Sequence, residues 1–134
     1  TGSTDRGLSW SHPQASGLSA SESMPSLTRI PTTGDLLLVW NNATYDHTYD
    51  HSGKRTPLTV AVSRDEGHSW NYVKNIEDDP DTEFSNIACT HLSDGRFIVS
   101  YFTSTMADPN PPGRLGRECM SLKGAISTLD WLYA

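Results

Sequence analysis

Short apolar runs, separated by polar stretches that contain glycine and proline, predict a chain built of β-strands. A continuous apolar run over residues 35–41 is typical of a strand buried on both faces, and the short β-branched segment over residues 58–62 predicts another strand. Weaker patterns predict further strands over residues 24–30, 70–76, 84–92, 96–102, 115–122 and 125–133. No segment shows the period of a helix, so we expect an all-β fold without helices.

A pattern of the form S-x-D-x-G-x-S-W occurs over residues 3–10 and again over residues 63–70. In such a pattern the aspartate accepts hydrogen bonds from nearby backbone N–H groups, the glycine adopts a positive φ, and the tryptophan is an apolar plug. The spacing of 60, from residue 3 to residue 63, suits a repeating unit of a few antiparallel strands. We therefore predict a tight turn between two strands at each copy, with structural roles for Asp5 and Asp65.

The repeated pattern resembles the Asp-box, or BNR repeat, of the sialidase-like β-propellers. Segments that resemble a bacterial branch of this superfamily lie over residues 22–26, 29–37, 40–42 and 129–133. The resemblance covers the whole chain and implies about two blades, each a four-stranded antiparallel sheet, of a six-bladed propeller. It implies a partial propeller over residues 1–134, with the end of one blade and a loop in 1–23, one full blade in 24–76 and the last blade in 84–134.

A compact β-sandwich is the alternative fold. A β-sandwich would need turns at a regular spacing of about 8–12 residues. The polar loops over residues 41–56 and 103–114 are too long for such a pattern, and the repeated motif has no role in a sandwich.

The resemblance to sialidases, which are glycoside hydrolases, implies site residues on the blade face opposite the motif turns. The long polar loops over residues 11–23, 41–56, 77–83 and 103–114 are expected to share that face. Glu22 falls where the family's catalytic glutamate stands, and Arg55 falls where its third carboxylate-binding arginine stands. Asn41 falls where the second arginine is expected and Phe84 where the tyrosine nucleophile is expected. Phe84 has no hydroxyl group and cannot act as that nucleophile.

The loop over residues 41–56 contains the sequence Tyr-Asp-His twice, at residues 45–47 and 49–51. Tyr45 and His47 are therefore candidate sugar contacts, with a solvated loop as the alternative. Metal binding through His47 and His51 is a weaker alternative, because their spacing aligns two ligands only on a helix. We expect no metal and no cofactor.

Two further groups of charged residues are weaker candidates. The acidic run that contains Asp78, Asp79, Asp81 and Glu83 predicts a solvated connector rather than an acid–base pair. Arg114 and Arg117 are candidate anion contacts.

Composition narrows the class of partner. The chain carries 10 Lys and Arg against 16 Asp and Glu, a net charge of −6, which argues against binding to nucleic acid or to an anionic membrane. No apolar run approaches the roughly 20 residues of a membrane-spanning helix. Cys89 and Cys119 predict either two buried thiols or one disulfide bridge. A secreted or periplasmic location is expected over a cytoplasmic one.

Two functions stay open. The first is a sialidase-like glycoside hydrolase acting on sialic-acid-type or related glycans, in which this chain by itself is inactive because half of the pocket is absent. The second is a propeller that binds a glycan or a protein without cleaving it. Because an incomplete ring leaves apolar blade faces bare, we also expect self-association or completion by upstream blades.

Overall fold

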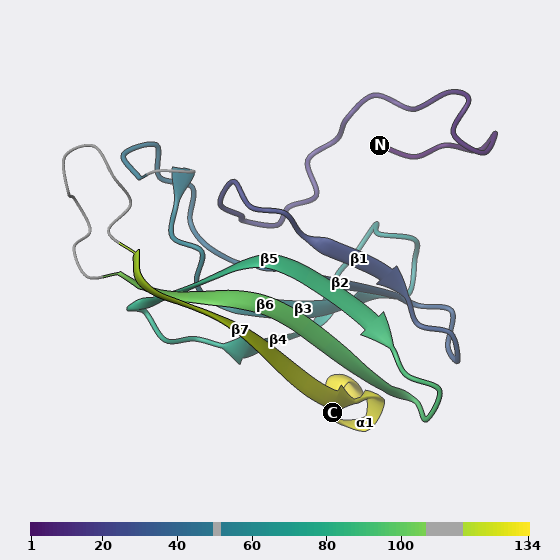
Figure 1. Cartoon of the computed structure of the whole chain (residues 1–134). Coiled ribbons are helices and arrows are strands. Elements are labelled where there is room, and N and C mark those ends of the chain that lie inside the picture. Colours follow the sequence, from purple (N-terminus) through teal and green to yellow (C-terminus); the bar gives the residue numbers. More distant parts are fainter. Residues whose placement is uncertain (50–51, 107–116) are drawn as a thin grey trace.

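The computed structural model describes residues 1–49, 52–106 and 117–134, without the side chains of residues 106 and 117–120. Its strands form two antiparallel sheets, which confirms the all-β fold (Figure 1). The first sheet has the order β1-β2-β3-β4 and the second has the order β5-β6-β7. The strands are β1 (Ser26–Arg29), β2 (Leu36–Asn41), β3 (Leu58–Ser63), β4 (Asn71–Glu77), β5 (Thr82–His91), β6 (Arg96–Met106) and β7 (Arg117–Thr128).

Strands β2 and β3 form the buried centre of the first sheet. Leu37 pairs with Val62 and Val39 pairs with Val60, and none of these side chains has exposed surface. Every residue of β3 is buried. On the other face of β2, Leu36 and Leu38 are only partly buried. The prediction that residues 35–41 form a strand buried on both faces is therefore confirmed in part.

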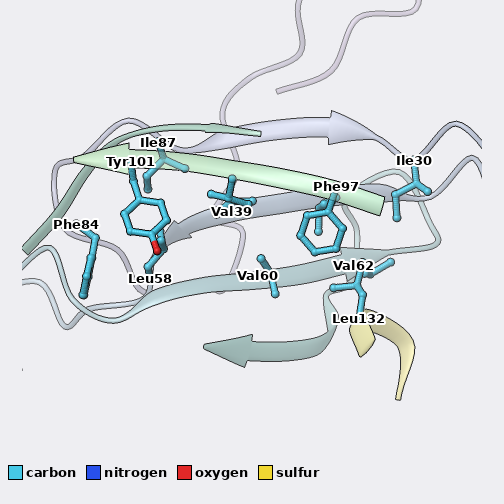
Figure 2. Packing of buried hydrophobic residues seen from close by; sticks show 12 residues of the cluster. Ile30, Val39, Leu58, Val60, Val62, Phe84, Ile87, Phe97, Tyr101 and Leu132 are labelled. Atoms are coloured by element: carbon cyan, nitrogen blue, oxygen red, sulfur yellow. The ribbon is translucent and has the colours of Figure 1, made fainter. Parts of the chain in front are cut away.

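One hydrophobic core joins the two sheets (Figure 2). Strands β1 and β2 pack against β5, and β6 contributes the fully buried side chains of Phe97, Val99 and Tyr101. Across this interface Thr28 Oγ1 and His91 Nε2 share a hydrogen bond of 3.0 Å. Neighbouring sheets that share a core in this way are consistent with successive propeller blades, although the two described sheets do not close a ring.

Both copies of the repeated motif fold into a tight turn, but only the copy over residues 63–70 connects two of the described strands. The described strands begin at Ser26, so the prediction that the N-terminal copy lies between strands is wrong. Between β3 and β4, the oxygens of Asp65 accept hydrogen bonds from the Ser69 backbone N–H at 2.8 Å and from the Ser69 hydroxyl at 2.6 Å. The hydroxyl oxygen of Ser63 accepts a bond from the Gly67 N–H at 2.8 Å. The corresponding distances in the N-terminal copy are 2.9, 2.6 and 2.7 Å. Gly67 has a φ of +88° and Gly7 a φ of +87°, which confirms the predicted role of the glycines.

The same hydrogen bonds stabilise the charged form of each motif aspartate. The Ser69 hydroxyl, followed by the Ser69 backbone N–H, lowers the pKa of Asp65 from 3.8 to about 2. Ser9 lowers the pKa of Asp5 to about 2 in the same way. Each turn therefore stabilises the ionised carboxylate of its aspartate, and the ionised carboxylate in turn holds the turn closed.

The two motif tryptophans share their local contact but differ in exposure. A Cβ atom added to Gly67 would lie 3.7 Å from the Trp70 ring, and one added to Gly7 would lie 3.7 Å from the Trp10 ring. Trp70 is partly buried, whereas 65% of Trp10 is exposed. The difference arises because the N-terminal copy stands clear of both sheets (Figure 1).

The C-terminal part of the chain differs from the prediction. A single strand, β7, replaces the two strands predicted after residue 115, and a short helix, α1 (Leu129–Tyr133), follows it. The prediction that the chain has no helix is therefore wrong. The Thr128 hydroxyl accepts a hydrogen bond from the Trp131 N–H at 3.1 Å and so caps this helix. Leu132 is fully buried in the core, and the cap and this burial together outweigh the strand-like apolar pattern of the segment.

The first sheet has the four strands predicted for a blade. Within the described residues the second sheet has three. In the same part of the chain, no helix has the length and apolar character needed to cross a bilayer.

Candidate functional site

Three of the segments predicted to share a face meet at one end of the sheets. The Thr56 hydroxyl donates to the Asp79 carbonyl at 2.9 Å and Lys54 Nζ donates to the Pro80 carbonyl at 3.3 Å, which ties the loop before β3 to the connector after β4. An open pocket of about 340 Å³ lies at this end of the sheets. Its lining residues are Glu22, Ser23, Met24, Arg55, Ser85 and Asn86.

Glu22 is exposed at the pocket and is held by the loop before β3. The Ser52 hydroxyl donates a hydrogen bond of 2.9 Å to Glu22 Oε1. The adjoining Gly53, with a φ of +143°, packs so closely that an added Cβ would lie 2.8 Å from the Thr44 carbonyl oxygen and 3.2 Å from the Ser21 Cβ. The loop thus fixes the segment that carries the Glu22 carboxylate.

Arg55 lines the same pocket with its backbone anchored. Its carbonyl oxygen accepts hydrogen bonds from the Phe84 N–H at 2.9 Å and from Asn41 Nδ2 at 2.8 Å. Its Nε atom is buried and, among the described residues, has no hydrogen-bond partner. A guanidinium group with a fixed backbone and an unpaired N–H is well suited to an anionic ligand.

Asn41 and Phe84 do not line the pocket; they lie behind it. Asn41 is fully buried, and its Nδ2 donates to the carbonyls of Arg55 at 2.8 Å and Phe84 at 3.0 Å. The Phe84 side chain is 1% exposed and packs edge-on against Tyr101, with ring centroids 5.8 Å apart. These two predicted substrate-binding residues are therefore placed to support the pocket wall.

Tyr45 and His47 lie outside the pocket lining. Both are exposed, in a loop that Asp46 organises by accepting hydrogen bonds from the Thr48 hydroxyl at 2.7 Å and N–H at 2.9 Å. Those bonds lower the pKa of Asp46. His51 lies outside the described residues, and within the described part no three His, Cys, Asp or Glu side chains gather to hold a metal ion.

The acidic connector after β4 forms a turn. Asp79 accepts hydrogen bonds from the Asp81 N–H at 2.9 Å and from the Thr82 hydroxyl at 2.8 Å, and these bonds lower its pKa. Asp78, Asp79 and Asp81 are exposed, in agreement with a solvated connector. Glu83 is instead buried in β5.

Of the remaining predicted residues, the structure describes some only in part. Arg114 and the side chains of Arg117 and Cys119 are outside the described residues. Cys89 is a free thiol whose pKa is raised by burial. The alternative of a disulfide bridge is therefore wrong.

The structure adds four pocket residues that the sequence did not identify, namely Ser23, Met24, Ser85 and Asn86. Ser23 and Met24 follow Glu22 in the sequence, and Ser85 and Asn86 follow Phe84. Their nearness in sequence to predicted site residues was the one indication that they could line the pocket. The residue type of Asn86 was a signal for its φ of +54°, because asparagine adopts positive φ more readily than other residues except glycine.

The pocket combines one guanidinium, one carboxylate, hydroxyl and amide groups, and the apolar side chain of Met24. An arginine fork binds a carboxylate through two parallel hydrogen bonds, and hydroxyl and amide groups suit the hydroxyls of a sugar. Most glycoside hydrolases use two carboxyl groups that flank the bond to be cleaved. Among the described lining residues, Glu22 is the one carboxylate.

Comparison with known families matches residues 1–99 to the BNR repeat-like domain. The matched segment contains both motif turns, the whole first sheet, β5 and the start of β6. No curated protein and no solved structure matches the chain. The two self-bonded Asp-box turns and the four-stranded antiparallel sheet agree with the family match, and the chain belongs to the BNR repeat-like domain family.

Proposed function

We propose that this chain provides the carboxylate-binding part of a sialidase-like pocket that recognises sialic-acid-type or related acidic glycans. The observation that carries the proposal is Arg55, which lines the pocket beside Glu22 with a buried Nε that no described residue accepts from. The Arg55 guanidinium lines the pocket, and a carboxylate bound there gains charge-assisted hydrogen bonds from its N–H groups.

Binding of N-acetylneuraminic acid to the chain tests this proposal, measured by titration calorimetry or ligand-observed NMR. Arg55→Met removes the charge while keeping a long side chain, and we expect it to weaken binding by about tenfold to a hundredfold, because a hydrogen bond to a charged group contributes about 1.5–3 kcal/mol. Arg96→Met is the matched control, because Arg96 pairs with Asp94 beside the β5–β6 turn. Equal binding by wild type and Arg55→Met rejects the proposal.

The second candidate function is hydrolysis of the glycan as a sialidase-like glycoside hydrolase. The position of Glu22 in the pocket, with a hydrogen bond from Ser52, favours it. Phe84 argues against the usual tyrosine mechanism, because it is buried and has no hydroxyl group. Binding without cleavage is therefore the function that the geometry supports best.

Turnover of a fluorogenic sialoside separates the two candidates. We expect none with this chain alone. We expect turnover, if hydrolysis is the function, in a polypeptide that joins this chain to the remaining blades, and its loss in Glu22→Gln. Turnover that survives Glu22→Gln excludes Glu22 from the mechanism, and no turnover on any sialoside leaves the binding function.

A further inference from the structure

A β-bulge places two consecutive side chains of β5 at the pocket. The register of β5 against β6 shifts between Ser85 and Ala88. Successive side chains of a regular strand point to opposite faces, yet both Ser85 and Asn86 line the pocket. Bulges of this kind are enriched beside functional sites, where they redirect a side chain.

The bulge begins from a fixed point. The Phe84 N–H donates to the Arg55 carbonyl at 2.9 Å, and the Phe84 carbonyl accepts a bond of 3.0 Å from the buried Asn41. The Phe84 ring is buried in the core, where it packs against the Tyr101 ring. Both backbone groups and the side chain of the residue before the bulge are thus held, and the same hydrogen bonds join this wall of the pocket to Arg55.

The backbone of Asn86 adopts the left-handed conformation, with a φ of +54°. Tyr72 does the same at the bulge in β4, and its ring packs against Tyr133 and Arg64. Asn86 is exposed, and within the described residues its side chain has no hydrogen-bond partner. Packing of its own side chain therefore does not explain why the strand adopts this conformation.

We infer that Asn86 determines specificity in this pocket by forming hydrogen bonds with a neutral group, a hydroxyl or an N-acyl amide, of the acidic sugar. The inference rests on the proposed function, in which Arg55 holds the carboxylate of the same ligand. The carboxamide both donates and accepts, which suits a hydroxyl or amide of a sugar ring. Ser85, which lines the pocket beside it, adds a hydroxyl to the same wall.

The test compares N-acetylneuraminic acid with cyclohexanecarboxylate, which keeps a carboxylate on a six-membered ring and lacks hydroxyl and amide groups. Asn86→Gly is the informative variant, because glycine adopts a positive φ without strain and removes the amide. We expect Asn86→Gly to weaken binding of N-acetylneuraminic acid by about three- to tenfold, the effect of a neutral hydrogen bond. Binding of cyclohexanecarboxylate and the midpoint of thermal unfolding should stay unchanged.

A purely conformational role predicts a different result, because glycine should then replace asparagine without loss. Unchanged binding of N-acetylneuraminic acid by Asn86→Gly overturns the inference, and so does an equal loss for both ligands. Arg55→Met reports on the proposed function separately, since it should weaken both ligands. If Arg55→Met has no effect while Asn86→Gly weakens the sugar acid alone, the carboxylate proposal fails and the role of Asn86 stands. If wild type binds neither ligand, both fail.

Discussion

At the scale of single residues, the motif aspartates show how a short pattern specifies a conformation. Asp65 uses both carboxylate oxygens within the turn, on the backbone and the hydroxyl of Ser69. The residue types at these positions therefore indicate the hydrogen bonds as well as the turn. The turn could be predicted from sequence because the hydrogen bonds that close it join residues at most four positions apart.

The two copies of the motif allow a controlled experiment on Asp65. We expect Asp65→Asn to lower the midpoint of thermal unfolding. Asp65 accepts hydrogen bonds at both carboxylate oxygens, an amide has only one oxygen to accept them, and the turn connects β3 to β4. Asp5→Asn removes the same bonds from a turn that stands clear of the sheets, and should leave the midpoint unchanged. Equal effects of the two substitutions would contradict this account.

The same aspartate gives a pH dependence with a defined sign. The folded-state pKa of Asp65 is lowered from 3.8 to about 2, so the unfolded chain takes up a proton first as the pH falls. The stabilisation is thus complete above pH 3.8 and is lost as the pH falls through about 2. The difference in unfolding midpoint between wild type and Asp65→Asn should narrow over that window, and a constant difference would contradict the assignment.

A third prediction at this scale concerns Gly53. We expect Gly53→Ala to destabilise the fold by about 1–3 kcal/mol, because φ is +143° and the added Cβ would lie 2.8 Å from the Thr44 carbonyl oxygen. Because Ser52 in the same loop holds the Glu22 carboxylate, displacement of the loop should also weaken ligand binding at the pocket. Gly95→Ala is the control, since Gly95 has a φ of +85° with no atom within 4 Å of the added Cβ. Urea unfolding measures the free energy of unfolding of both variants and so separates the steric clash from the cost of a positive φ. Equal losses of free energy in the two variants would exclude the clash.

At the scale of elements, the buried strands were predictable and the end of the chain was not. The run that contains Leu37 and Val39 indicates a strand covered on both faces, and β2 is buried on one face and partly buried on the other. The segment after Thr128 has a similar apolar character. Its conformation depends on a cap and on the space available to Leu132 in the core, and neither is visible in a local pattern.

Helix α1 closes one end of the interface between the sheets. Leu132 contributes a fully buried side chain to the shared core, and Lys74 of β4 donates to the Trp131 carbonyl. Tyr133 donates a hydrogen bond of 2.5 Å to Asp35 and contacts the Tyr72 ring. The helix therefore joins the strand that ends the second sheet to β4 of the first.

We expect Leu132→Ala to lower the free energy of unfolding by about 2–5 kcal/mol, the range for removing a large buried aliphatic side chain. Leu8→Ala is the matched control, because Leu8 in the N-terminal segment is 89% exposed, and its effect should stay within about 0.5 kcal/mol. Urea unfolding monitored by tryptophan fluorescence measures both. Similar values for the two variants would show that α1 does not contribute to the core.

The elements of the site were only partly predictable, for the same physical reason. Glu22 and Arg55 could be placed together from the resemblance to sialidases, and they line one pocket. Asn41 was predicted as a ligand contact, and the structure places it behind the pocket, donating two hydrogen bonds to backbone carbonyls. The bulge at Asn86 depends on how β5 packs against β6, which no short pattern encodes.

At the scale of the whole molecule, each sheet has an outward face that no other described part of the chain covers fully. Leu27 in β1 is 57% exposed, and in β7 Leu122 and Ile126 are 71% and 56% exposed. Leu122 and Ile126 alternate with Lys123, which pairs with Glu77 on the inner side, so the two apolar side chains share the outer face. Exposed apolar side chains that share one face of a sheet mark an interaction site or an aggregation hazard.

We expect the isolated chain to self-associate through these faces, with contacts between unlike surfaces of successive copies. Sedimentation velocity over a range of concentrations should show species heavier than 14.7 kDa. Replacing both Leu122 and Ile126 with lysine should shift the distribution towards the monomer. Leu8→Lys, at a residue that is 89% exposed in the N-terminal segment, is the control and should not. A single monomeric species in wild type at all concentrations would reject this expectation.

The self-contained bonding of the motif turns also bears on the order in which the chain folds. Each turn closes with contacts between residues at most four positions apart in its hydrogen bonds, and the N-terminal copy has the same geometry without a sheet beside it. Contacts that close so small a loop form faster than those between distant strands. We therefore expect the hairpin of β3 and β4 to form from its turn before the two sheets meet.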